Sequence, residues 1–296
     1  MKFYLTVNPH GGAKKGPKLL KKVKPMFDKA DIELTIIETM FAGHAKELAE
    51  QLDFTGYDGM ISIGGDGTLH EVVNGLMYRK DGINFPIGLI PGGSGNSFMH
   101  DLELVDPVDA ANAIIYGNTT KVDIAEVKIN HITKYAINII GWGLVTDIAN
   151  KAEKHRWMGT SRYTILSVLE VMTNKPRPAA LVIGDKRISD DFTFIIACNT
   201  IHTGKAMKMA PKAKLDDGLM DIIVVKHKAS RIKLLSMLPT VFEGTHINNP
   251  IVEYYTESEF SLIPKEDELL NIDGEIAGST PIDVKMIPKR IEVFCK

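Results

Sequence analysis

Residues 59–77 read GMISIGGDGTLHEVVNGLM, and this stretch indicates the fold of the first half of the chain. The apolar run over residues 59–63 predicts a buried strand that ends at Gly64 and Gly65. Apolar residues then return at the spacing of a helix, at Leu69, Val72, Val73 and Leu76. A strand that passes into a helix through a glycine turn is the repeating unit of a parallel sheet covered by helices.

The same alternation extends to both sides of this stretch. Further strands are predicted over residues 3–7, 33–37 and 87–90. Helices are predicted over residues 19–27, 43–52 and 107–116. We therefore expect residues 1–125 to form a doubly wound α/β domain with a mostly parallel sheet.

The second half of the chain has a different pattern, in which short apolar runs are separated by turn residues. Strands are predicted over residues 134–140, 180–183, 192–197, 220–225, 260–263 and 282–286. Helical stretches interrupt them over residues 164–172 and 232–242. We expect residues 126–296 to form an antiparallel β domain, with the last residues free to return to the first domain.

Composition excludes several classes of protein. The 296 residues carry a net charge of −2, so nothing indicates a nucleic-acid partner. The two cysteines, Cys198 and Cys295, are far apart, which argues against a disulfide framework and favours the cytoplasm. No apolar run reaches about 18 residues, so no transmembrane segment is expected.

Three predicted strands of the first half end in glycine-rich loops. The loops read NPHGGAKKG (8–16), GGDGT (64–68) and PGGSGNS (91–97). In an open parallel sheet such loops meet at the carboxyl ends of the strands, where glycine lets the backbone approach phosphate groups. None of the loops has the spacing of a Walker A or a dinucleotide-binding motif. We expect them to bind one polyphosphate together.

Asp66 stands out because it lies between Gly65 and Gly67 in the second loop. An aspartate in such a turn can cap the following helix. It can also face bound phosphates and either hold Mg²⁺ or accept a proton from the substrate, which suits phosphoryl transfer.

The segment GGDGTLHEVVNGLM (64–77) resembles the catalytic motif of the diacylglycerol kinase and sphingosine kinase family, most closely the sphingosine kinases. Further similar segments occur in the order expected for that family, at residues 8–12, 39–45, 91–98, 142–145, 153–164 and 273–275. The resemblance spans nearly the whole chain. It implies an α/β domain followed by a β-sandwich, with ATP, Mg²⁺ and a membrane lipid meeting in the cleft between them.

The resemblance also implies roles for individual residues. Asp66 and Glu275 would be catalytic, while Asp147 and Glu71 would contact the lipid substrate. Nucleotide contacts would come from Asn8, Pro9, Gly11, Gly12, Thr39, Gly64, Gly65, Gly67, Thr68, Gly93, Ser94, Gly95, Asn96, Arg156, Arg162, Asp273 and Gly274. Mg²⁺ would be held by Asp66 and Asp123.

A second, structural metal site is implied at residues 214–219. Asp217 would supply a side-chain ligand there, with backbone oxygens from Lys214 and Leu219. The alternative is a plain Asp-Asp-Gly turn between two strands.

Two departures from the family pattern leave the lipid open between a sphingoid base and a diacylglycerol. Ser97 stands where bacterial diacylglycerol kinases usually have an aspartate. Ala149 stands at the second of two acidic positions found in sphingosine kinases, of which Asp147 is the first.

Other assignments also stay open. Helix 164–172 can line an acyl-chain pocket or be an ordinary core helix, and the lysines of residues 14–22 can meet anionic headgroups or only solvent. NAD kinase and a non-catalytic lipid- or nucleotide-binding relative are the alternative functions. We expect a cytoplasmic enzyme that touches membranes transiently, with homodimer formation left open.

Overall fold

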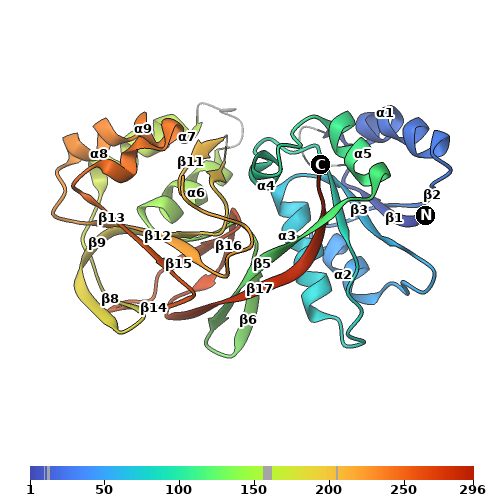
Figure 1. The fold of residues 1–296 in the computed structure, drawn as a ribbon. Helices are drawn as coiled ribbons and strands as arrows, with labels where there is room; N and C mark the ends of the chain where they lie inside the picture. The colour runs from blue at the N-terminus through green and yellow to red at the C-terminus, as the bar shows by residue number, and fades with distance from the viewer. Residues whose placement is uncertain (10, 12–13, 156–161, 205) are drawn as a thin grey trace. The chain divides into compact units, whose positions relative to one another are not determined.

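A computed structural model describes residues 1–9, 11, 14–155, 162–204 and 206–296 (Figure 1). The chain divides into two compact units. Unit 1 comprises Met1–Ile124, Gly204–Ala206 and Pro288–Lys296, and unit 2 comprises Ala125–Thr203 and Met207–Ile287. The end of the chain thus belongs to unit 1. Within the described ranges, no helix is long and apolar enough to cross a membrane.

Unit 1 is built on a parallel sheet with the strand order β2-β1-β3-β4. Its strands are β1 (Lys2–Val7), β2 (Glu33–Glu38), β3 (Gly59–Gly64) and β4 (Ile87–Pro91). The last strand of the chain, β17 (Ile282–Phe294), joins the sheet in parallel beside β4, where Val293 pairs with Ile87.

Helices cover both faces of this sheet. One face carries α1 (Gly16–Lys29) and α5 (Pro107–Tyr116), and the other carries α2 (His44–Gln51) and α3 (Asp66–Tyr78) (Figure 1). The short helix α4 (Ser97–Asp101) follows the third glycine loop. This is the doubly wound arrangement that the sequence predicts.

The pairing of α2 with α3 depends on Gly75. A Cβ atom at this position would lie 2.3 Å from the backbone oxygen of Lys46, so only glycine allows the two helices to come this close. The contact matters because α3 begins at Asp66.

Unit 2 is a β-sandwich whose strands pair antiparallel. Its central strand order is β16-β15-β7-β9-β8-β14-β17, and β12 lies between β9 and β13. The strands of this unit are β6 (Ile132–Ala136), β7 (Ile139–Gly143), β8 (Arg177–Ile183), β9 (Lys186–Cys198), β10 (His202–Thr203), β11 (Met207–Lys208), β12 (Met220–Lys226), β13 (Val252–Glu257), β14 (Glu259–Pro264), β15 (Leu269–Ile272) and β16 (Glu275–Ser279), with parts of β5 (Thr119–Ile129) and β17.

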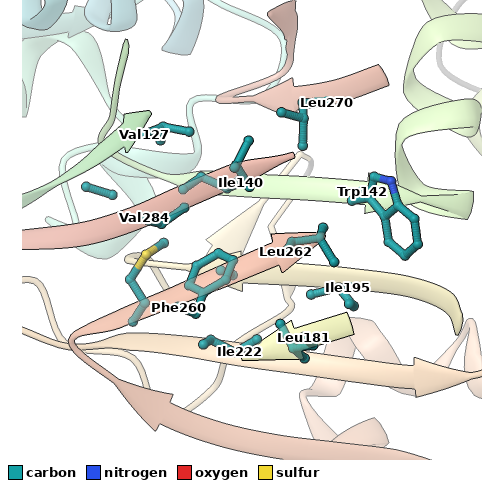
Figure 2. Packing of buried hydrophobic residues seen from close by; sticks show 14 of the residues in the cluster. Val127, Ile140, Trp142, Leu181, Ile195, Ile222, Phe260, Leu262, Leu270 and Val284 are labelled. Atoms are coloured by element: carbon teal, nitrogen blue, oxygen red, sulfur yellow. The ribbon is translucent and has the colours of Figure 1, made fainter. Parts of the chain in front are cut away.

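Alternation along the central strands builds two cores in unit 2. On β9, Ile195 and Ala197 belong to the core inside the sandwich. Figure 2 shows Ile195 in this core with Trp142 and Phe260. The intervening residues face a second core beneath the helices. The helices α6 (Leu144–Lys154), α7 (Arg162–Thr173) and α8 (Arg231–Met237) contribute to this second core, and the unit also contains α9 (Thr240–Glu243) and the 3-10 helix η3 (Thr245–Asn248).

Two predicted elements are interrupted in the structure. The strand predicted over residues 134–140 is two strands, β6 and β7, because the carboxylate of Asp273 takes up the backbone N–H groups of residues 137–139 that a continuous ladder would use. The helix predicted over residues 232–242 is also two helices, because Pro239 has no N–H to continue the first and begins the second as its N-cap.

Candidate active site

The carboxylate of Asp66 connects the second and third glycine loops. Its Oδ2 accepts a hydrogen bond from the backbone N–H of Ser97 at 2.9 Å, and its Oδ1 accepts one from that of Phe98 at 3.3 Å. These N–H groups form the start of α4, where an anion is favoured. Asp66 is partly exposed, so its carboxylate is held in place at a surface that solvent and ligands can reach.

The two loops also touch through their backbones. A Cβ atom on Gly93 would lie 2.6 Å from the Cα of Gly65, and the N–H of Gly92 donates to the oxygen of Gly64 at 2.7 Å. A Cβ atom on Gly95 would lie 3.1 Å from Oδ2 of Asp66. Larger residues at these positions would push the loops apart. Glycine therefore allows the two loops to approach each other around Asp66.

The first glycine loop lies against the same strand ends. The N–H of Asn8 donates to the oxygen of Ile63 at 3.2 Å, and the Oδ1 of Asn8 accepts from the N–H of Gly11 at 2.8 Å. Pro9 is partly exposed. The predicted contact Gly12 lies outside the described residues.

Several predicted nucleotide contacts in unit 1 shape their own loops. Asn96 adopts a left-handed backbone with φ +55°, and its side chain bonds the N–H and the oxygen of Gly93 at 3.0 and 3.2 Å. The hydroxyl of Thr68 lies over Gly64, where a Cβ atom would be 2.3 Å away. Ser94 is exposed at the tip of its loop, and Gly67 is partly exposed.

Thr39 and Glu71 organise the segment that follows β2. The N–H of Thr39 donates to the oxygen of Val7 at 2.9 Å, which ties this segment to the end of β1. Glu71 accepts from the N–H of Gly43 at 2.9 Å and from that of Ala45 at 3.1 Å. Both oxygens of Glu71 thus hold the beginning of α2, and the contact with the lipid substrate that the resemblance implies for this residue stays a prediction.

The predicted metal ligands differ in accessibility. Asp123 is fully buried on β5, and its Oδ1 accepts from the backbone N–H of Lys289 at 2.6 Å. Asp217 is exposed in a turn, where its Oδ1 accepts from the N–H of Leu219 at 3.1 Å and Gly218 has φ +76°. This turn also contains Lys214, which is exposed. The described part of the chain contains no group of three His, Cys, Asp or Glu side chains arranged to hold a metal ion.

The Asp273-Gly274-Glu275 motif divides into structural and exposed parts. Asp273 and Gly274 have φ angles of +54° and +95° and form the two-residue turn between β15 and β16. The buried carboxylate of Asp273 accepts from the N–H groups of Ile137, Asn138 and Ile139 at 2.9, 2.7 and 2.9 Å. Glu275 is exposed at the start of β16, so its side chain is the one of the three that solvent reaches freely.

In unit 2, Asp147 forms an ion pair with Arg177. The Arg177 side chain is only 3% exposed, and its Nε also donates to Glu268 at 2.8 Å. Burial raises the pKa of Asp147, while the guanidinium of Arg177 opposes this rise. Sequence reasoning missed Arg177 and Glu268, since neither lies within a motif and no local pattern marks them.

The remaining predicted sites concern α7 and the segment before it. Arg156 lies outside the described residues, as does the side chain of Arg162, so their predicted phosphate contacts stay predictions. On α7, Leu166 and Val171 are buried. The opposite side of the helix has four apolar side chains that are each more than 40% exposed, at Ile165, Val168, Leu169 and Met172. Only one side of this helix therefore belongs to the core.

Comparison with known proteins identifies two family domains. Residues 2–127 match the family described as diacylglycerol kinase catalytic domain. Residues 138–295 match the family described as YegS C-terminal NAD kinase beta sandwich-like domain.

Relatives extend over nearly the whole chain. Sphingosine kinase 1 of Arabidopsis thaliana is 30% identical over 93% of this chain and 68% of its own length. Diacylglycerol kinase of Staphylococcus carnosus is 30% identical over 97% of this chain and 92% of its own length. A crystal structure of a diacylglycerol kinase from Bacillus anthracis has the same fold, with a TM-score of 0.80 at 24% identity, and the match covers 100% of this chain and 97% of that one.

Proposed function

The chain belongs to the family of kinases with a diacylglycerol kinase catalytic domain, and from this premise we propose that it transfers the γ-phosphoryl group of ATP to a hydroxyl group of a membrane lipid, with Asp66 as the catalytic carboxylate. The observation that carries this proposal is the pair of hydrogen bonds that hold the Asp66 carboxylate beside the glycine loops.

The glycine loops suit the binding of phosphate groups. Their backbones meet without intervening side chains, and N–H groups at the start of a helix favour negative charge. Ser94 is exposed in the third loop and available to a ligand. Phosphoryl transfer requires mainly positioning and neutralisation of charge, which such loops supply.

Asp66 acts on the acceptor. Its carboxylate accepts the proton of the lipid hydroxyl while the new bond forms between the hydroxyl oxygen and the γ-phosphorus. The bond between the γ-phosphorus and the bridging oxygen breaks, and ADP leaves with the bonding electrons. The two backbone hydrogen bonds keep the carboxylate oriented throughout this step.

Magnesium would be held by Asp66, since Asp123 is fully buried and bonded to the backbone of Lys289. The ion would supply neutralisation of charge on the phosphate oxygens. At a second, structural metal site, Asp217 would supply a side-chain oxygen from its exposed turn.

For the acceptor lipid, the ion pair of Asp147 favours an uncharged headgroup of the diacylglycerol type over a cationic sphingoid base. Asp147 and Glu268 share the buried guanidinium of Arg177, and Lys175 lies 3.5 Å from Glu268. Arg177 pairs with both carboxylates, so an amine bound at Asp147 would compete with this guanidinium and would meet repulsion from it.

The exposed apolar side of α7, defined by Ile165, Val168, Leu169 and Met172, supports contact with acyl chains. Side chains of this kind favour an apolar environment over water. A kinase that draws its acceptor from a bilayer needs such a contact at the membrane surface.

A panel of acceptors tests the proposed function. Purified protein is incubated with labelled ATP, magnesium chloride and either diacylglycerol, monoacylglycerol, sphingosine, ceramide or NAD, and the products are identified by mass spectrometry. Phosphorylation of diacylglycerol ahead of sphingosine is expected. A product from NAD alone would establish the NAD kinase alternative, and ATP binding without turnover on any acceptor would favour a non-catalytic relative.

A further inference from the structure

An exposed aromatic side chain lies in the loop between β2 and α2 and has no role in the proposed mechanism. Phe41 is 51% exposed, although large apolar residues normally avoid water. Its ring stacks on the ring of His44, with 4.8 Å between the centroids and 25° between the planes. The two rings thus present an aromatic surface at one end of α2.

The loop that carries Phe41 is held by contacts on both sides. Thr39 bonds the end of β1, and the N–H of Met40 donates to Nδ1 of His44 at 3.1 Å. Glu71 accepts from the N–H groups of Gly43 and Ala45. The loop is therefore ordered before any ligand binds, which lowers the entropic cost of using it as a binding surface.

The same contacts place this loop relative to Asp66. Glu71 lies five residues after Asp66 on α3, about 7.5 Å further along the helix axis. Val7, to which Thr39 is bonded, directly precedes Asn8 of the first glycine loop. Because β1 and β2 are parallel and Val7 pairs with Glu38, the loop with Phe41 and the first glycine loop leave the same edge of the sheet, so a nucleotide with its phosphates on the glycine loops would have the Phe41 loop beside it.

The chemistry of the surface suits a nucleobase. Every nucleobase, whatever its identity, has a π-face that can stack on an aromatic ring. Because Nδ1 of His44 accepts the N–H of Met40, the neutral ring carries its proton on Nε2, which makes a hydrogen-bond donor available beside the stacking surface.

We propose that Phe41 is the stacking platform for the base of the phosphoryl donor, and that Glu71 is a positioning residue that holds this platform at the correct distance from Asp66. The inference rests on the proposed function in one respect, namely that the donor is a nucleotide.

The test compares two probes, ATP and inorganic tripolyphosphate, whose binding to the full chain is measured by calorimetry in magnesium chloride. Phe41→Ala is expected to raise the Kd of ATP about tenfold and to leave the Kd of tripolyphosphate unchanged, because only ATP has a base. Phe41→Trp should restore ATP binding. Phe242→Ala serves as the matched control, since Phe242 is a phenylalanine of similar exposure, 54%, on α9.

For Glu71, the informative variant is Glu71→Gln, because a carboxamide offers one acceptor oxygen for two N–H groups. It should raise KM for ATP by a larger factor than it lowers kcat, again without affecting tripolyphosphate binding. A loss of tripolyphosphate binding in parallel would mean a general structural role and would overturn the assignment.

The outcomes separate this inference from the proposed function. If the wild type binds ATP and Phe41→Ala binds it equally well, the platform is refuted and the kinase assignment stands. If Phe41→Ala instead loses only binding to lipid vesicles, Phe41 is a membrane contact and the platform is likewise refuted. If the wild type binds no ATP, both the platform and the proposed function are wrong.

Discussion

The backbone N–H of Ser97 donates a 2.9 Å hydrogen bond to the carboxylate of Asp66, across 31 residues of sequence. This bond explains how a chain without an aspartate at position 97 still organises its third glycine loop. The backbone N–H groups of the loop help to orient the carboxylate. Ser97 itself is buried, and its hydroxyl lies 3.4 Å from the oxygen of Gly204.

Asp66→Asn is expected to lower kcat on the lipid acceptor by a factor of about 10²–10⁴, because a carboxamide cannot accept the hydroxyl proton. One end of the amide would also place an N–H₂ group against a backbone N–H. The measurement is steady-state phosphorylation of diacylglycerol, with circular dichroism to verify that the variant is folded. Turnover at the wild-type rate would remove Asp66 from the mechanism.

Substitutions at Asp273 and Glu275 should have different effects, although the two residues belong to one motif. Asp273→Asn preserves a residue suited to the turn but offers one acceptor oxygen to three N–H groups, so the free energy of unfolding should fall by about 2 kcal/mol. Glu275→Gln changes an exposed side chain and should leave stability within about 0.5 kcal/mol of wild type.

Urea denaturation measures the stability of both variants, and the phosphorylation assay measures their activity. If Glu275 has the catalytic role that the family resemblance implies, Glu275→Gln lowers kcat without lowering stability. Equal destabilisation by the two substitutions would contradict the structural role that we assign to the buried Asp273 and not to the exposed Glu275.

Arg177→Gln should shift the choice of acceptor toward cationic lipids. The substitution removes the guanidinium that compensates Asp147 and Glu268, and it leaves both carboxylates available to an amine. The variant will also be less stable, because it breaks a buried ion pair. The informative quantity is therefore the ratio of sphingosine to diacylglycerol phosphorylation, which does not depend on the folded fraction.

For Arg177→Gln, a rise of that ratio by several-fold is expected. Lys228→Gln is the control, since Lys228 is 83% exposed and forms its ion pair with Asp190, outside the group of charges around Arg177. A ratio unchanged in Arg177→Gln would show that this ion pair does not select the acceptor.

His246 should make unit 2 sensitive to acid. Its side chain is buried, with Nε2 3.0 Å from the oxygen of Met209, and burial lowers its pKa below the ordinary value of 6.5. The folded state therefore binds a proton less readily than the unfolded state. The stability due to neutral His246 is complete above pH 6.5 and is lost progressively as the pH falls below that value.

Comparing urea denaturation at pH 7.5 and pH 5.5 checks this expectation. His246→Gln should lower stability at the higher pH and reduce the loss between the two conditions, whereas replacement of the exposed His131 should change neither. An identical acid-induced loss in wild type and His246→Gln would assign the sensitivity to other groups.

The sequence by itself determined the α/β class of the first half, the β-rich character of the second half and the position of Asp66 in a glycine turn. These features are local. Apolar spacing of two or 3.6 residues specifies strands and helices, and the close approach of two backbones at Gly65 and Gly93 requires glycine at those positions.

Only the tertiary structure decided which partner each polar side chain takes. Glu71 reaches Gly43, Arg177 reaches Asp147, and Asp273 reaches Asn138 across 28, 30 and 135 residues, respectively. A buried polar group needs a hydrogen-bond or ion-pair partner. Which N–H group or charge lies within reach of each side chain is decided by the packing of segments that are distant in the sequence. No spacing along the chain encodes that choice.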